Sequence, residues 1–435
     1  MQRPVNGFSK LSKQQKIEWI AKECTQDPEK TKKLLEKYWN ADTDLQKTHD
    51  EFIENTLSNF YLPYAVAPNF LINEQLLAIP MTIEESSVVA AASKAAKFWL
   101  TKGGFKTEVL GTEKIGQVHF MYYGQKNKLV NLIEALQPKF MADTAAITKN
   151  MNKRGGGISA INLRDKTDQL EGYYQLHCTF ETLDAMGANF INSCLEQFAT
   201  TLENAVAIHP EFANDKPEVV MSILSNYVPN CVVRASVSCP ITNTKSENSV
   251  SRTFAEKMYQ AVTIAKTEPF RAVTHNKGIM NGIDAVVLAT GNDFRAIEAG
   301  VHAYAAKDGK YSSLTHCTIE NNEFKFWIDV PLALGTVGGL TSLHPLVKLS
   351  LEILQQPSAK ELMQIIAVAG LAQNFAALRS LVTTGIQKGH MKMHLLNILN
   401  TLGANDKEKE QLVALFKEQT VSNAAVTEAL ENLRR

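Results

Sequence analysis

The order of apolar and polar positions divides the chain into stretches of different character. Residues 9–60 are rich in charge and predict helices that start near Ser12 and Asp42, both good helix caps. An alanine-rich stretch at 87–100 predicts a helix that packs closely against another element, and the glycine pair at 103–104 ends it.

Residues 111–228 alternate between short apolar stretches and longer helical ones. The strands predicted here are 116–124, 175–180 and 218–225, and the predicted helices are 129–136 and 185–208. Such a compact alternation is typical of a small α+β domain inserted into a larger one.

From about residue 229 the pattern predicts long helices joined by glycine-rich turns. One helix is expected near Pro345, where proline fits a first turn, and another over 358–382. After the segment 385–390 a charged helical tail follows, and the chain shows no internal repeat.

The segment 275–300 concentrates candidate chemistry. Lys277 stands among glycines, the apolar run 285–289 predicts a buried strand, and Asp293 is placed to cap a helix that starts near Phe294. A lysine can stabilise an oxyanion if a neighbouring carboxylate keeps it protonated. Taken alone, each residue is more commonly a surface lysine or a simple cap.

Composition excludes several classes of function. The 45 basic and 45 acidic residues cancel, so no charge excess indicates a nucleic-acid or membrane partner, although a local basic pocket for a phosphorylated cofactor is compatible. No signal-peptide pattern is present, and apolar stretches such as 365–372 are too short to span a bilayer, so a cytoplasmic protein is expected.

The six cysteines are scattered, without a C-x-x-C pair, so the sequence predicts neither a zinc site nor a redox motif. No metal is expected, and a metal-dependent hydrolase is excluded because no cluster of His, Cys and Asp has ligand spacing.

The segment 275–300 resembles the signature of hydroxymethylglutaryl-coenzyme A (HMG-CoA) reductases, in their soluble class II form. Further matches follow in the order of that family: Glu54-Asn55 with 62–67, Glu84-Glu85 with 87–92, 184–189, Gln373-Asn374 and Gly389-His390. The chain departs from the family at Thr56, Ser58 and Ser86, which leaves the local backbone shape open.

The resemblance implies four catalytic residues. Lys277 would stabilise the thioester oxygen, Glu85 would donate a proton to the aldehyde oxygen, and Asp293 would bridge the two. His390, on a hinged C-terminal segment, would protonate the coenzyme A thiolate. Without the resemblance, Glu85 would be taken as a solvated first-turn residue and His390 as structural.

The resemblance also implies binding residues. The substrate carboxylate would be bound by Arg271, with Ser87, Asn281, Gln373 and Asn374 completing the pocket; a polar pair within a helix is the alternative for the last two. The expected cofactor contacts are Asp184, Met186, Gly187, Ala188, Asn189, Asn226, Thr148 and Lys149.

The cofactor motif lacks the G-x-G-x-x-G pattern, and its glycine would allow the pyrophosphate to approach a helix N-terminus. Relatives that use NADH carry an aspartate shortly before the glycine triplet 155–157. The corresponding stretch 146–154 has no acid and three cations, which favours NADPH over NADH. A solvated helix end would explain the same cations.

The fold implied is α+β. A large mainly helical domain (1–110 and 229–384) would carry an inserted ferredoxin-like α/β-sandwich cofactor domain (111–228) and a C-terminal helical flap (385–435). A homodimer or larger assembly is expected, in which regions 50–92 and 271–293 meet across the interface, because Glu85 and Lys277 would come from different subunits.

The function implied is interconversion of HMG-CoA and mevalonate through mevaldehyde, with two hydrides from NADPH or NADH. The direction stays open. A catalytically inactive protein that binds coenzyme A thioesters is the alternative, and the presence of Glu85, Lys277, Asp293 and His390 argues against it.

Overall fold

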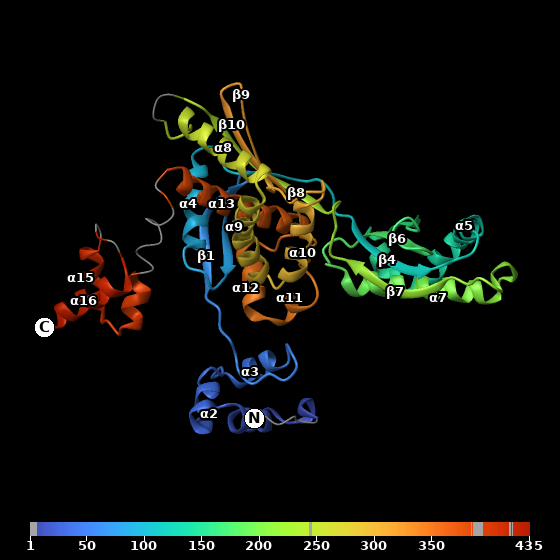
Figure 1. Cartoon of the computed structure of the whole chain (residues 1–435), viewed down its shortest axis with the longest axis horizontal. Helices are drawn as coiled ribbons and strands as arrows, with labels where there is room; N and C mark the ends of the chain where they lie inside the picture. Colours follow the sequence, from blue (N-terminus) through green and yellow to red (C-terminus); the bar gives the residue numbers. More distant parts are fainter. Residues whose placement is uncertain (1–6, 243–245, 384, 386–394, 417–418, 420) are drawn as a thin grey trace.

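The computed structural model describes residues 7–242, 246–383, 385, 395–416, 419 and 421–435. Figure 1 shows a central body of helices and strands, a smaller α/β unit beside it, and helices at each end of the chain. Three separate hydrophobic clusters correspond to the central body, the α/β unit and the C-terminal helices. The mixed α+β class predicted from the sequence is confirmed.

The N-terminal helices begin where the sequence predicted. The elements are η1 (Phe8–Lys10), α1 (Lys13–Cys24), α2 (Pro28–Lys37) and α3 (Thr43–Asp50). Ser12 forms a capping box with Gln15, and the Asp42 carboxylate accepts from the backbone N–H of Asp44 and Leu45. None of the three hydrophobic clusters includes residues of these helices.

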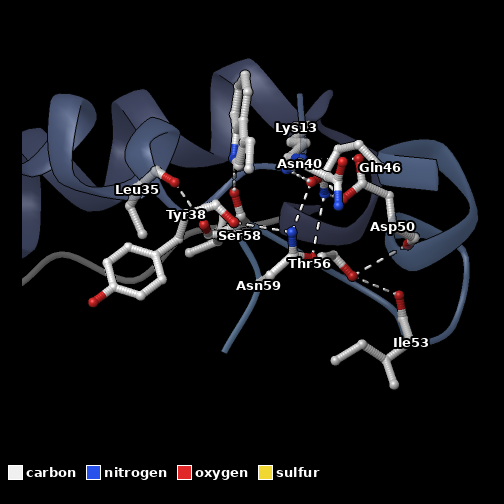
Figure 2. Close-up of polar contacts among 12 residues, drawn as sticks. Lys13, Leu35, Tyr38, Asn40, Gln46, Asp50, Ile53, Thr56, Ser58 and Asn59 are labelled. Carbon is white, nitrogen blue, oxygen red and sulfur yellow. Dashed lines mark hydrogen bonds and ion pairs between the residues drawn. The ribbon is translucent and has the colours of Figure 1, made fainter. Parts of the chain in front are cut away.

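Polar contacts connect these helices to the segment that follows them (Figure 2). Lys13 pairs with Asp50 at 2.8 Å. Two of the three residues that depart from the family pattern take part: Thr56 Oγ1 donates to the carbonyl of Ile53 at 3.0 Å, and Ser58 Oγ donates to the carbonyl of Leu35 at 2.5 Å. Both hydroxyls therefore fix the backbone of this segment.

The central body contains a hairpin and a four-stranded sheet that the sequence pattern did not predict. The hairpin is β1 (Tyr64–Ile72) and β2 (Gln75–Thr82), and the sheet has the order β3 (Lys106–Val109), β8 (Val232–Pro240), β10 (Glu323–Pro331) and β9 (Thr315–Glu320), all antiparallel. The expectation that the chain returns to helices and turns after 229 was therefore incomplete.

Helices complete the central body. They are α4 (Val88–Leu100), α8 (Arg252–Thr267), α9 (Pro269–Ala289), α10 (Phe294–Ala305), α11 (Leu340–Leu343), α12 (Pro345–Ile353) and α13 (Ala359–Val382). The helix predicted over 87–100 and those near Pro345 and over 358–382 are confirmed. A capping box of Ser358 and Glu361 starts α13.

The strand predicted over 285–289 is wrong, because these residues form the last turns of α9. Gly282, which resembled a turn residue, has a packing role inside this helix: a Cβ there would lie 2.4 Å from the carbonyl oxygen of Ala369. Glycine therefore allows α9 and α13 to pack closely, backbone to backbone.

Helix α13 is long and apolar enough to cross a membrane by length and composition alone. Most of its residues are buried in the core of the central body, against α9, α4 and β8. Burial on nearly all sides explains its apolar sequence.

The α/β unit has the order β4 (Lys114–Met121), α5 (Lys126–Asp143), α6 (Ala145–Asn152), β5 (Gly157–Asp165), β6 (Tyr173–Glu181), α7 (Ala188–Ile208), η2 (Pro210–Phe212) and β7 (Glu218–Ser225). Its antiparallel sheet has the order β5-β6-β4-β7. This β-α-β-β-α-β arrangement confirms the ferredoxin-like prediction.

The chain enters and leaves this unit side by side. Leu110 N–H donates to the carbonyl of Val232 at 2.8 Å, and a Cβ on Gly111 would lie 2.3 Å from the carbonyl oxygen of Asn230. The unit is thus an insertion between β3 and β8 of the central sheet.

The last described part of the chain consists of a helical stretch at 395–401, α15 (Asp406–Leu415) and α16 (Asn423–Arg434), which share a small hydrophobic cluster. Arg434 pairs with Glu408 at 2.8 Å and links α15 to α16. The predicted charged helical tail is confirmed for these residues.

Candidate active site

Helix α9 presents Lys277 to solvent. Glu268 caps the helix by accepting from Arg271 N–H at 2.7 Å, and Pro269 occupies the first turn. The opposite face of α9 packs on α13, so the helix is anchored in the core. Lys277 therefore projects from a rigid element, rather than from the loop that the flanking glycines had indicated.

Lys277 is paired with Glu85 within the same chain. Its ammonium Nζ lies 2.7 Å from Glu85 Oε2, and the two side chains are 60% and 40% exposed. Glu85 lies in the short segment between β2 and α4. The sequence analysis expected these two residues to come from different subunits, whereas here a single chain brings them together.

Ser87, two residues after Glu85, has an uncommon backbone conformation. It is the N-cap of α4, with φ of 75° in the left-handed region, and its side chain makes no capping hydrogen bond. A non-glycine residue in this region is strained, and such strain is concentrated at functional sites. Its hydroxyl and the first N–H groups of α4 are therefore available to a ligand.

Arg271 and Asn281 lie on the same helix as Lys277. Asn281 is one turn after it, on the same face, and is half-buried. Burial lowers the pKa of the Arg271 guanidinium, which forms no ion pair with any residue that the structure describes. A partly desolvated guanidinium without a carboxylate partner is suited to bind an anion.

Asn374 and Gln373 lie on α13, and only one of them has unused hydrogen-bonding capacity. Asn374 is buried; it donates to the carbonyl of His275 at 3.2 Å and accepts from Thr315 Oγ1 at 3.2 Å. Buried Gln373 leaves its Oε1 without a partner among the described residues. Asn374 therefore fits the structural alternative, whereas Gln373 keeps an open acceptor.

His275, which the Asn374 network encloses, is not a catalytic candidate. Burial lowers the pKa of its imidazole to about 3, so it is neutral at physiological pH. Its Nε2 lies 2.6 Å from Thr315 Oγ1. We assign it a structural role in the core.

Asp293 caps α10, as predicted, but does not bridge Lys277 and Glu85. Its Oδ1 accepts from the backbone N–H of Arg295 at 3.0 Å and of Ala296 at 3.2 Å, and its Oδ2 pairs with the Arg295 guanidinium at 3.0 Å. The predicted bridge is absent from the described chain because both carboxylate oxygens are engaged at the helix N-terminus.

The sequence analysis missed Asp284, two turns after Lys277 on α9. Burial raises the pKa of its carboxyl to about 8, reinforced by a hydrogen bond and charge repulsion from Glu298 on α10 and by charge repulsion from Glu84. Glu298 in turn lies 3.2 Å from His302 Nε2. The helical spacing from Lys277 would have identified Asp284 if 269–289 had been recognised as a helix.

The cofactor motif 184–189 joins the α/β unit to the central body. Asp184 Oδ1 accepts from Ala359 N–H at 2.8 Å, so this carboxylate oxygen is bound to the first turn of α13. Gly187, with φ of 88°, precedes α7 and provides no side-chain cap. The N-terminus of α7 therefore has N–H groups open to an anion.

A small pocket lies beside this helix N-terminus. Three predicted cofactor residues, Met186, Ala188 and Asn226, line it together with residues of α10. Asn189 is exposed in the first turn of α7. Because Asp293 caps α10, the pocket and this catalytic candidate share one helix.

Thr148 and Lys149 differ in exposure. Thr148 is 3% exposed, and its Oγ1 accepts from Asn152 Nδ2 at 3.2 Å. Lys149 is exposed on the last turn of α6. A Cβ at Gly156 would lie 2.6 Å from the carbonyl oxygen of Glu181, so the turn after α6 lies next to the segment that leads into the cofactor motif.

His390 lies outside the described residues, as does Gly389. Within the described ranges, no group of three or more His, Cys, Asp or Glu side chains could bind a metal ion.

Comparisons with known proteins identify the family. The sequence model described as hydroxymethylglutaryl-coenzyme A reductase matches residues 12–395. The 3-hydroxy-3-methylglutaryl-coenzyme A reductase of Archaeoglobus fulgidus is 36% identical over 442 residues, covering 100% of this chain and 95% of that protein. A probable reductase of Borreliella burgdorferi is 36% identical, covering 84% of this chain and 83% of the relative.

Solved structures agree as well. A reductase structure from Streptococcus pneumoniae has a TM-score of 0.72 and 36% identity, covering 99% of this chain and 100% of that one. A structure of the class II enzyme of the same organism, bound to NADPH in open conformations, also has a TM-score of 0.72 and covers 98% of this chain. The chain belongs to the hydroxymethylglutaryl-coenzyme A reductase family.

Proposed function

We propose that this member of the family is an active class II reductase that interconverts HMG-CoA and mevalonate through enzyme-bound mevaldehyde. The observation that carries the proposal is the ion pair of Lys277 and Glu85, 2.7 Å apart and partly exposed. The two residues that the reaction requires for charge stabilisation and proton donation are thus in contact before substrate binds.

Lys277 stabilises the oxyanion that forms when the thioester carbonyl is reduced. Its pairing with Glu85 orients the ammonium, and its position on α9 keeps it rigid. Glu85 donates the proton to the oxygen of mevaldehyde in the second reduction. Asp293 acts from the N-terminus of α10, after rearrangement of its contact with Arg295.

Arg271 binds the terminal carboxylate of the substrate. Its unpaired guanidinium supports this role, and the free hydroxyl of Ser87, the amide of Asn281 and the unpartnered Oε1 of Gln373 supply further polar contacts. Asn374 shapes the same wall from within the core.

The residues around the N-terminus of α7 fit a nicotinamide cofactor. An uncapped helix end, a glycine with positive φ and an adjoining pocket lined by Met186, Ala188 and Asn226 support binding of a dinucleotide there. The bound cofactor supplies the two hydrides. Asp184 keeps the motif against α13, and Asn189 extends the polar edge of the site.

NADPH is the proposed cofactor, with NADH as the alternative. The exposed cations Lys149, Lys153 and Arg154 support a 2′-phosphate, and the stretch 146–154 has no acid that would repel it. Thr148 is buried, so its part in the proposed cofactor site is indirect, through its hydrogen bond with Asn152. The NADPH bound to the Streptococcus pneumoniae enzyme supports the same choice.

The proposed domains are 1–110 with 229–384 for substrate binding and dimerisation, 111–228 for the cofactor, and 385–435 as a flap. Separate hydrophobic clusters in the three parts support this division. His390 would protonate the coenzyme A thiolate from the start of the flap. That role rests on the resemblance, since His390 lies outside the described residues.

We also propose a homodimer or a larger assembly of dimers. Apolar side chains remain uncovered between the N-terminal helices and β1, with Phe60 92% exposed and Ile53 68% exposed. Patches of this kind usually mark a protein interface. A cytoplasmic protein without nucleic-acid or membrane partners is consistent with the balanced charge.

The test is a spectrophotometric assay with HMG-CoA and NADPH or NADH, and with mevalonate, coenzyme A and the oxidised cofactors. We expect cofactor oxidation and recovery of mevalonate with one mevalonate per two cofactors. Tight HMG-CoA binding without turnover under either cofactor would instead support the inactive thioester-binding alternative.

A further inference from the structure

The α/β unit contains a buried lysine to which neither the catalytic proposal nor the sequence motifs gave a role. Lys114 is the first residue of β4 and is 5% exposed. Its ammonium donates to the carbonyl of Ala185 at 2.9 Å and to Thr182 Oγ1. Burial lowers the pKa of this lysine, because the charged form loses its hydration.

No carboxylate within the described residues forms an ion pair with Lys114. The two nearest acids act only at longer range and are bound elsewhere: Glu181 accepts from Leu183 N–H at 2.8 Å, and Asp184 accepts from Ala359 N–H. A buried charge without a partner is costly, so its retention calls for an explanation.

The position of Lys114 explains why a lysine is retained there. It lines the small pocket beside α7 together with Met186, Ala188 and Asn226. Its two acceptors, Thr182 and Ala185, form the turn that leads into Gly187 and the uncapped N-terminus of α7. The partial positive charge of a 21-residue helix and the amino group of Lys114 therefore converge on one wall.

The ammonium group also has one N–H that can bind a ligand. A lysine has three donors, and two of them are bound by Thr182 and Ala185. The third has no acceptor among the described residues. Geometry, charge and hydrogen-bonding capacity all indicate an anionic ligand at this point.

We propose that Lys114 binds the pyrophosphate of the nicotinamide cofactor. It would do so from its position against the turn 182–185, close to the N-terminus of α7. This inference rests on the proposed function, since it assumes that the pocket binds a dinucleotide. It makes Lys114 a cofactor-binding residue that is distinct from the exposed cations near Lys149.

The competing explanation is that Lys114 only fixes the turn 182–185. Ligands with and without a pyrophosphate distinguish the two roles. NADPH and ADP-ribose contain a pyrophosphate, whereas 2′-AMP carries only the phosphate at the 2′ position. We would measure dissociation constants by calorimetry for the wild type, Lys114→Met and the control Lys216→Met, an exposed lysine of the same unit.

If Lys114 binds the pyrophosphate, Lys114→Met weakens NADPH and ADP-ribose by about 10- to 100-fold and leaves 2′-AMP within about twofold. Unchanged affinity for NADPH, or an equal loss for all three ligands, would overturn the proposal. If wild-type protein binds neither NADPH nor NADH, the proposed function itself fails, which is a different outcome.

A second measurement covers the case in which Lys114→Met does not fold. In wild-type protein with ¹⁵N-labelled lysine, the Lys114 side-chain signal is identified by its loss in Lys114→Arg. Adding ADP-ribose should raise the pKa of this ammonium, because an opposite charge favours the protonated form. A pKa that does not change on saturation with ADP-ribose would refute the contact.

Discussion

Lys277 and Lys114 are two lysines held in opposite environments. Lys277 is largely exposed and paired with Glu85 at 2.7 Å, whereas Lys114 is buried and has only neutral oxygen partners. The exposed pair loses little by being open to solvent, and its partners can separate when a substrate enters. The buried ammonium cannot move without disturbing the turn that it supports.

The difference suggests that the exposed surface of α9 and the buried start of β4 serve different functions. A residue that must exchange partners during a reaction is placed on a helix surface, with a partner of modest strength. A residue that must define where an anion rests is fixed beforehand, and the cost of burying its charge is recovered when the ligand arrives. The following experiments test whether this contrast holds.

The largest effect is expected for Lys277→Ala. Removal of one oxyanion donor costs about 3–4 kcal/mol of transition-state stabilisation, or roughly 10²- to 10³-fold in kcat. Because the side chain is exposed, thermal stability and NADPH affinity should stay close to wild type. Lys257→Ala, at an exposed lysine of α8, is the control. Turnover near the wild-type value would reject the catalytic role.

Mixing two inactive variants tests whether the pair acts within one chain. Glu85→Ala and Lys277→Ala proteins are combined, and exchange of subunits is verified by mass spectrometry of tagged chains. Since Glu85 and Lys277 meet within one chain, every site in a mixed dimer lacks one of them, so no activity should return. Recovery of activity would mean that the functional pair forms between subunits.

His390→Gln separates thioester reduction from aldehyde reduction. If His390 protonates the coenzyme A thiolate, the variant should lose about 10²-fold or more in HMG-CoA reduction. Reduction of free mevaldehyde releases no thiolate and should be largely spared. Equal losses with both substrates would indicate a positioning role. Lys277→Ala, by contrast, should impair both reactions.

Helix caps explain which elements the sequence could predict. Ser12, Asp42, Asp293 and Ser358 each cap a helix through local hydrogen bonds, so their signal does not depend on the rest of the fold. The apolar run 285–289 fits a buried strand and a buried helix equally well. Only the close contact of Gly282 with Ala369 decides for the helix, and that contact is tertiary.

In the candidate active site, too, contacts between residues far apart in the sequence could not be predicted from local patterns. Spacing along the chain could not show that Glu85 and Lys277 meet, since 192 residues separate them; the resemblance supplied both residues but assigned them to different subunits. Lys114 carries no sequence signal at all. Its burial and its bond to Ala185 depend on how β4 packs below the cofactor motif, which no local pattern encodes.

Asp284 is a half-buried acid on α9, the helix that also carries the exposed Lys277. Its folded-state pKa of about 8 lies above the ordinary 3.8, so the folded protein retains a proton that the unfolded chain releases. The retained proton on Asp284 makes its full contribution to the free energy of unfolding below pH 4, and this contribution is lost as the pH rises toward 8. Asp284→Asn keeps a neutral side chain at every pH and should remove this loss.

The measurement for Asp284→Asn is urea unfolding at pH 5 and pH 8. Relative to wild type, the variant should gain up to a few kcal/mol at pH 8 and less at pH 5. Asp308→Asn, at an exposed aspartate, is the control. Parallel pH dependence for Asp284→Asn and wild type would show that the carboxyl is not protonated in the folded protein.

The smallest effect is expected at Lys149, where an exposed cation faces the same cofactor whose pyrophosphate we assign to Lys114. Solvent and salt screen an exposed lysine, so its contact with a 2′-phosphate should contribute only about three- to tenfold to the preference for NADPH over NADH. Lys149→Ala should reduce that preference in kcat/KM without weakening NADH. Lys114→Met should weaken both cofactors alike, because both contain the pyrophosphate. Thr148→Asp is less informative, since Thr148 is buried and a carboxylate there would also destabilise α6. A wild-type enzyme several-fold better with NADH, or a preference that Lys149→Ala leaves unchanged, would reject the assignment of Lys149 and leave that of Lys114 intact.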